Sequence, residues 1–195
     1  MDSLEALRAR KSRATDKDQV SGLLYAGVHI PLRAWLGAEA AKSLLRPSFI
    51  PERMAHFSRF PVRGFLELLE AATEASAVTG RELGPTLRRL GSAVLEAYLD
   101  SPEGRLTVAV NGGDAHRMLG ALPAAYRSLL SFGMRKTRNV SDQEALVRFE
   151  GDYLGPELHA GALESAIRES AQVQAKVAVS DVSGDGCNFT LSVVW

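Results

Sequence analysis

Apolar and polar residues recur with two different periods along this chain, and the change of period divides it in two. Before about Gly133 the apolar positions recur every three or four residues, which is the spacing of amphipathic helices. A helical pattern returns from Pro156 to Ile167. Alternation of apolar and polar residues predicts four strands, at Met134–Val140, Glu144–Glu150, Val173–Val179 and Cys187–Trp195. This order predicts an α+β fold, with an N-terminal helical layer followed by a C-terminal four-stranded antiparallel sheet with one crossing helix.

Proline and glycine divide the helical part into segments. We expect a helix from Val20 that Pro31 breaks, and a second helix from Pro31 to about Leu45. Pro47 and Pro51 predict a loop, because proline lacks a backbone donor and disfavours helix in the residue before it. Further helices are predicted over Phe65–Thr79, Pro85–Tyr98 and Asp114–Pro123.

The run Leu106–Val110 can be read in two ways. Its Leu-Thr-Val-Ala-Val sequence has strand propensity. Ser101 and Pro102 nevertheless form a good helix start, with a serine cap and a proline at the first helical position. Because Gly112 is also a good helix stop, we expect a short helix from Pro102 to about Asn111.

Composition and charge indicate one ordinary globular domain. The chain has 195 residues, of which 46% are hydrophobic and 24% charged. Residues 1–19 are dense in mixed charge and are expected to form a flexible charged N-terminal arm, with residues 20–195 as a single α+β domain. Basic and acidic residues balance at 23 each, so no nucleic-acid partner is expected. No signal peptide or membrane span is visible, which predicts a cytoplasmic protein.

Catalytic and metal-binding patterns are weak throughout the sequence. The single cysteine, Cys187, excludes an internal disulfide and is expected to be a small core residue. Asp181, Ser183 and Asp185 resemble a calcium loop but lack its downstream glutamate, so a hairpin turn is favoured. Because no pair of nucleophile and base is visible, we expect a protein that is not an enzyme.

A basic patch, one histidine and one interior space remain as candidate sites. Arg135, Lys136 and Arg138 form a basic patch on a predicted strand, where they either protect a sheet edge or bind an anionic partner. His116 is either a surface or core residue or an axial ligand of haem or a metal. The space under the helices could hold a small apolar ligand. The remaining histidines show no metal-ligand spacing: His29, His56 and His159.

A series of short motifs, whose order carries more weight than any one of them, spans about Val20 to Trp195. The motifs are Val20-Ser21-Gly22-Leu23-Leu24, Phe60-Pro61-Val62, Leu90-Gly91, Ser101-Pro102-x-Gly104, His116-Arg117-x-Leu119, Leu122-Pro123, Phe149-x-Gly151, Leu154-Gly155-Pro156, Gly161-Ala162-Leu163 and Phe189-x-Leu191-x-Val193-x-Trp195. Together they resemble a myxobacterial paralogous family of unknown function. That family is similar in fold to haem nitric oxide/oxygen binding (H-NOX) domains, four-vinyl-reductase domains and the Bet3-like subunits of the TRAPP tethering complex.

The resemblance implies a comparison with the haem site of H-NOX domains. Their proximal histidine precedes a proline, much as His116 precedes Pro123. Their Tyr-x-Ser-x-Arg motif, which holds the haem propionates, would fall on Phe149–Tyr153, where all three motif positions are changed. An acid of this stretch would also face the two propionates, and burying uncompensated like charges together is costly. We therefore expect no cofactor, with haem on His116 as the alternative.

The leading functional hypothesis is a non-enzymatic cytoplasmic signalling or scaffolding domain that acts through contacts with protein partners. The resemblance to Bet3-like subunits implies a homodimer as one form of such contacts. Arg135, Lys136 and Arg138 are the candidate partner-binding residues. The alternative is a sensor domain that binds haem or a small apolar ligand between the helices and the sheet.

Overall fold

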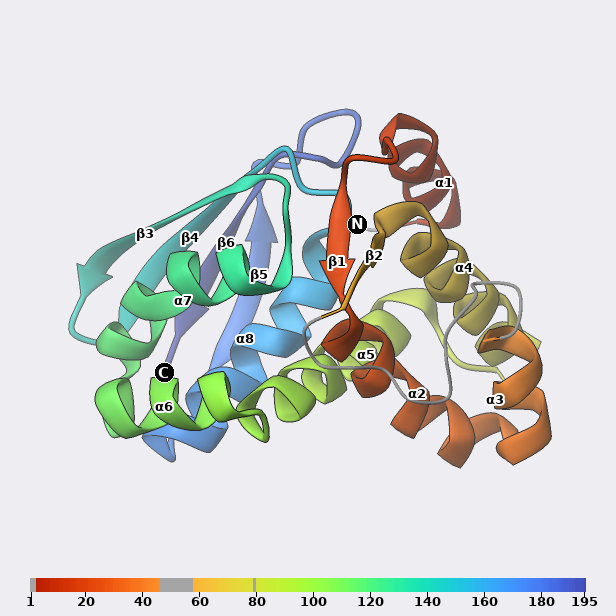
Figure 1. The fold of residues 1–195 in the computed structure, drawn as a ribbon. Coiled ribbons are helices and arrows are strands. Elements are labelled where there is room, and N and C mark those ends of the chain that lie inside the picture. The colour runs from red at the N-terminus through yellow and green to blue at the C-terminus, as the bar shows by residue number, and fades with distance from the viewer. Residues whose placement is uncertain (1–2, 46–57, 79) are drawn as a thin grey trace.

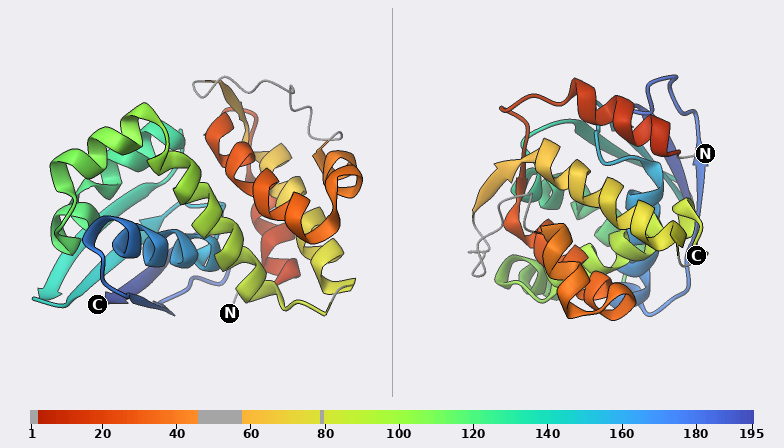
Figure 2. Two further views of the ribbon diagram at one scale, coloured as in Figure 1. Left: turned by 90° about the horizontal axis from the view of Figure 1, so that it is seen from below. Right: turned by 90° about the vertical axis from the view of Figure 1, so that its right-hand side faces the viewer.

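The computed structural model describes residues 3–45, 58–78 and 80–195, and these form two groups of elements joined by one long helix (Figure 1). The first group contains α1 (Leu4–Arg13), β1 (Gln19–Ser21), α2 (Gly22–Leu36), α3 (Ala38–Leu45), β2 (Arg59–Pro61) and α4 (Val62–Val78). The second contains α6 (Pro102–Asn111), α7 (Ala115–Leu129), β3 (Met134–Ser141), β4 (Glu144–Glu150), α8 (Pro156–Ala171), β5 (Lys176–Ser180) and β6 (Phe189–Val194). The joining helix, α5 (Leu83–Leu99), runs between the two groups (Figure 2). Within the described ranges, no helix is long and apolar enough to cross a membrane.

The four-stranded sheet has the order β3-β4-β6-β5 and is antiparallel throughout. Alternation sends Val147 and Phe149 to the buried face of β4, while Arg148 points to solvent. Helices α7 and α8 pack on that buried face (Figure 1). The predicted α+β fold, with its late sheet and one crossing helix, is confirmed.

Helices α5 and α8 cross with their backbones in contact, and glycine permits this. A Cβ atom built at Gly91 of α5 would lie 1.8 Å from the carbonyl oxygen of Leu158. A Cβ atom built at Gly161 of α8 would lie 1.9 Å from the carbonyl oxygen of Arg88. The ion pairs from Arg88 to Glu157 (2.7 Å) and Glu164 (2.6 Å) hold the same crossing from the side.

The short helix predicted from Pro102 to Asn111 is confirmed as α6, with Ser101 as its N-cap. The predicted breaks at Pro31 and Pro123 are wrong, because both prolines lie inside continuous helices. A proline in a helix interior costs about 3 kcal/mol. Burial of the apolar residues on both sides of each proline offsets that cost. The loop predicted at Pro47 and Pro51 lies outside the described residues.

The flexible N-terminal arm expected over residues 1–19 is wrong for Leu4–Arg13, which form helix α1. Leu7 and Arg10 are fully buried, and the Arg10 side chain donates a hydrogen bond to the carbonyl oxygen of Tyr153. Arg8 pairs with two acidic residues of α4, Glu70 and Glu74. Arg8 and Arg10, two of the charges that suggested disorder, therefore have partners more than fifty positions away, which the local sequence does not reveal.

Candidate functional site

A buried ion pair lies where β4 leaves the sheet and turns toward α8. Asp152 is completely buried, and its carboxylate accepts a hydrogen bond from Arg135, which is 8% exposed. The same carboxylate accepts the backbone N–H of Leu154 at 2.8 Å, while Arg135 also donates to the carbonyl oxygen of Phe132. Burial alone raises the pKa of Asp152, but the Arg135 guanidinium and the hydrogen bonds donated by His159 and by the backbone N–H of Leu154 outweigh it and hold that pKa well below its usual range.

His159 extends this pair into a network of four side chains. Its Nε2 lies 2.9 Å from Asp152 Oδ1, and its Nδ1 lies 2.7 Å from the Tyr126 hydroxyl oxygen. An ionised carboxylate only accepts, so Nε2 carries a proton and donates to Asp152. A neutral ring then accepts the Tyr126 O–H at Nδ1. Burial raises the pKa of Tyr126, which keeps its hydroxyl protonated as this arrangement requires.

Aromatic rings fill the space around this network, between the sheet and α8. The His159 ring stacks on Phe149 with centroids 4.5 Å apart, and Phe149 stacks on Phe189 at 4.8 Å. The Arg135 guanidinium lies over the Tyr126 ring, 4.9 Å from its centroid. The network is therefore tightly enclosed, and apart from Arg135 Nε, which is buried without a hydrogen-bond partner, its polar atoms bond to one another or to neighbouring backbone groups.

An apolar cavity of about 50 Å³ adjoins the network on the side away from the sheet. It lies among α5, α6, α7 and α8, and its walls include Val94, Met118, Leu122 and Leu163. No residue of the described strands β3–β6 lines it. The interior space considered from the sequence therefore lies among helices rather than between helices and sheet.

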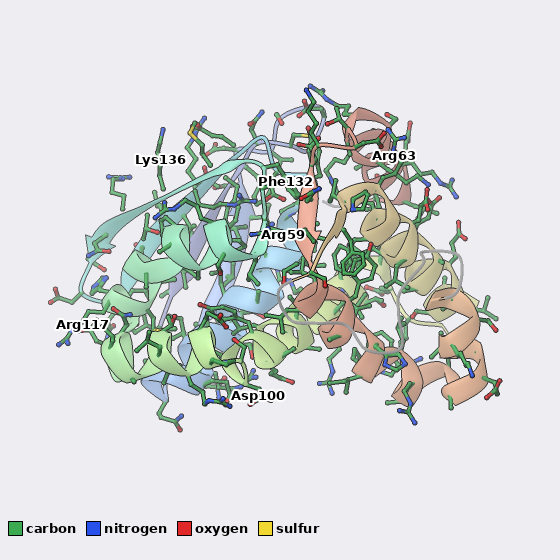
Figure 3. All side chains as sticks on the ribbon, viewed as in Figure 1. Arg59, Arg63, Asp100, Arg117, Phe132 and Lys136 are labelled. Atoms are coloured by element: carbon green, nitrogen blue, oxygen red, sulfur yellow. The ribbon has the colours of Figure 1, made fainter. Side chains whose placement is uncertain are left out.

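A second, more polar cavity of about 130 Å³ adjoins the first, and we call it the vestibule. Tyr98 and Leu129 line both cavities. The other vestibule residues include Arg59 and Glu103, which bring one positive and one negative charge. Arg59 donates to the carbonyl oxygen of Ser128 near the end of α7, at 2.7 Å (Figure 3).

The residues singled out from the sequence occupy three different environments. Lys136 is exposed on the face of the sheet opposite α7 (Figure 3), and alternation along β3 puts the exposed Arg138 on the same face. The expected patch of three basic residues is wrong for Arg135, because strand alternation points it inward to Asp152. His116 is half-buried and packs edge-on against the Trp195 ring, with centroids 4.8 Å apart. The structure therefore does not bring His116 and the basic residues together.

Sequence reasoning missed Tyr126 and treated His159 only as a scattered histidine. A signal for His159 exists, because it shares helical spacing with the buried Leu163 and Ala166. The sequence showed an acid in Phe149–Tyr153 without a compensating partner, and the structure gives Asp152 of that stretch two partners, Arg135 and His159. Strand pairing supplies Arg135, since the register of β3 on β4 places it opposite Phe149.

Comparisons with known proteins support the fold and add a family. A protein family described as "Protein of unknown function (DUF2378)" matches residues 13–195. Comparison with curated proteins found no match. Among solved structures, the Fe(II) unliganded H-NOX protein from K. algicida is similar with a TM-score of 0.68 and 13% identity, over 89% of this chain and 95% of that one. The H-NOX protein from S. oneidensis in the Fe(II)NO state gives a TM-score of 0.70 at 10% identity, over 89% and 97%.

At this identity the likeness establishes an H-NOX-like fold, and the fold raises the question of haem. In the part of the chain that the structure describes, the two cavities do not fit that group. His116 is not among the residues that line either cavity. The apolar cavity of about 50 Å³ is also far smaller than the roughly 300–1,000 Å³ of pockets for larger ligands. The stacked rings of Phe149, His159 and Phe189 occupy the space between α8 and the sheet.

Proposed function

The chain belongs to the DUF2378 family, and we propose that it is a non-enzymatic sensor domain that binds a small apolar ligand without haem. The cavity among α5, α6, α7 and α8 is the observation that carries this proposal, because its walls are almost wholly apolar. Buried apolar surface of this kind gains free energy when a ligand replaces empty space or poorly bonded water. The domain would work in the cytoplasm and pass its signal on through protein contacts.

The internal network supports binding over catalysis. Tyr126, His159 and Asp152 satisfy one another with hydrogen bonds of 2.7 and 2.9 Å. A general base needs a free acceptor that a substrate can reach. The lone pair of His159 that would serve is already used by Tyr126, so the network holds the cavity wall in place instead.

Methionine methyl groups give a direct test, because Met118 lines the cavity and Met134 is 58% exposed on β3. We expect toluene to shift the NMR signal of a labelled Met118 methyl group and to leave that of Met134 unchanged. Ala125 also lines the cavity, while its neighbour Ala124 is exposed and does not. Ala125→Phe should abolish the shift and Ala124→Phe should preserve it. Equal shifts at both methionines, or none at Met118, would contradict the proposal.

Haem independence has its own test. Purified protein mixed with haem should show no Soret band characteristic of a histidine ligand, and His116→Ala should give the same spectrum as the parent. A sharp Soret band that His116→Ala removes would mean that the helices open to admit haem. That result would overturn the haem-free part of the proposal.

Output through protein contacts is supported by Lys136 and Arg138, two exposed basic residues that share the outer face of β3. Size-exclusion chromatography and pull-down are expected to show a homodimer or a complex that Lys136→Glu with Arg138→Glu weakens. Lys42→Glu, an exposed position on α3, is the matched control. A strict monomer without a captured partner would count against this output.

A further inference from the structure

We infer that the ligand of this domain is an amphiphile with a short apolar body and an uncharged polar head. The inference rests on the proposed function and specifies its ligand. It follows from two adjoining cavities of opposite character, the apolar one of about 50 Å³ and the vestibule of about 130 Å³.

The two cavities meet at the side chains that they share. Tyr98 and Leu129 line both, so an elongated molecule that occupied both spaces would have to pass these two residues. The Tyr98 hydroxyl bonds to the Thr107 hydroxyl at 3.0 Å, and Thr107 lines the apolar cavity. The Tyr98 hydroxyl therefore already has a hydrogen-bond partner, and the Tyr98 ring lies between the two spaces.

The apolar cavity is an unfavourable place for a polar group. The walls contributed by Val94, Leu122 and Ala166 offer no hydrogen bond, and a polar head placed there would lose its bonds to water. The apolar part of a ligand thus belongs among α5, α7 and α8. Its polar part belongs in the vestibule.

The two charged residues of the vestibule determine which polar head group of the ligand is favoured. Arg59 attracts an anion and repels a cation, whereas Glu103 does the reverse. The hydrogen bond from Arg59 to the carbonyl oxygen of Ser128 holds its guanidinium beside the C-terminal end of α7. Both side chains are exposed and line the same space, so a charged head of either sign gains from one and loses to the other. A hydroxyl, which both donates and accepts, suits both residues.

Three matched hexyl compounds test this, namely 1-hexanol, hexanoate and hexylammonium, with affinity read from the Met118 methyl signal. We expect 1-hexanol to bind the parent protein most tightly. Glu103→Gln should improve hexanoate binding by about fivefold, and Arg59→Gln should improve hexylammonium binding by a similar factor. Glu39→Gln, an exposed change on α3, is the control and should alter none of the three affinities. Circular dichroism checks that each variant is folded.

The outcomes separate this inference from the function on which it rests. If toluene shifts Met118 but neither charge variant changes the preference among the hexyl compounds, the head-group inference is overturned and apolar binding stands. If none of the four compounds shifts Met118, the proposed function itself fails. Stronger binding of hexanoate or hexylammonium than 1-hexanol by the parent protein also overturns the inference.

Discussion

Replacing Asp152 with asparagine removes one charge from the buried network and leaves its shape almost unchanged. The amide oxygen can still accept the N–H of Leu154, which Asp152 Oδ1 accepts at 2.8 Å. The amide nitrogen cannot accept from Arg135, so the guanidinium is left buried without its counter-charge. Breaking a buried pair by removing one partner costs about 3–5 kcal/mol of unfolding free energy. For a domain of this size that corresponds to a fall in melting temperature of about 6–20 °C.

Urea unfolding followed by circular dichroism measures this cost, provided that the slope with denaturant stays constant between variants. Asp152→Asn combined with Arg135→Met removes both charges. The double variant should be more stable than the sum of the single changes predicts, by about 0.5–3 kcal/mol. Glu39→Gln, at an exposed position, should leave the unfolding free energy within experimental error. If Asp152→Asn costs under about 1 kcal/mol, or if the two changes simply add, the reasoning about a coupled buried pair is refuted.

Three further changes test other parts of the structure. Gly161→Ala should destabilise the protein by at least about 1–3 kcal/mol in thermal unfolding, because the added methyl group meets the carbonyl oxygen of Arg88 at 1.9 Å. Gly120→Ala on α7 is the control and should not destabilise the protein, since its added methyl group meets nothing within 4 Å. Leu7→Ala should lower the unfolding free energy by about 2–5 kcal/mol, because Leu7 of α1 is fully buried. A change near zero would instead support a flexible N-terminal arm. Because the folded pKa of Asp152 lies below its unfolded value of about 3.9, its contribution is complete above that pH and is lost as pH falls toward the folded pKa. Acid titration should therefore show a steeper loss of stability below about pH 4 in the parent than in Asp152→Asn, and parallel curves would show that Asp152 is not responsible.

Local patterns predicted much of the fold, and long-range packing explains the main exceptions. Alternation predicted the four strands in their order along the chain, and cap residues predicted α6, because both signals lie within a few neighbouring positions. The helices through Pro31 and Pro123 could not be predicted locally. Their continuity depends on burial supplied by distant elements.

The candidate site was harder to predict for the same reason. Tyr126, Arg135, Asp152 and His159 come from α7, β3, the loop before α8 and α8 itself. Each looks ordinary in its own segment, and only the register of the sheet and the crossing of α8 bring them together. A cavity is harder still, because it depends on what side chains leave unfilled.

The glycine contacts along α5 have a consequence for how a signal would leave the cavity. Val94 lines the cavity, and a Cβ atom at Gly27 of α2 would lie 2.5 Å from the Cα atom of Val94. On its other side α5 meets α8 backbone to backbone at Gly161. Because so little side-chain material lies between these helices, we expect that a ligand displacing the cavity wall would shift α5 as one rigid helix. The N-terminal helices resting on it would then turn with it, which makes their surface the place to look for a change of shape.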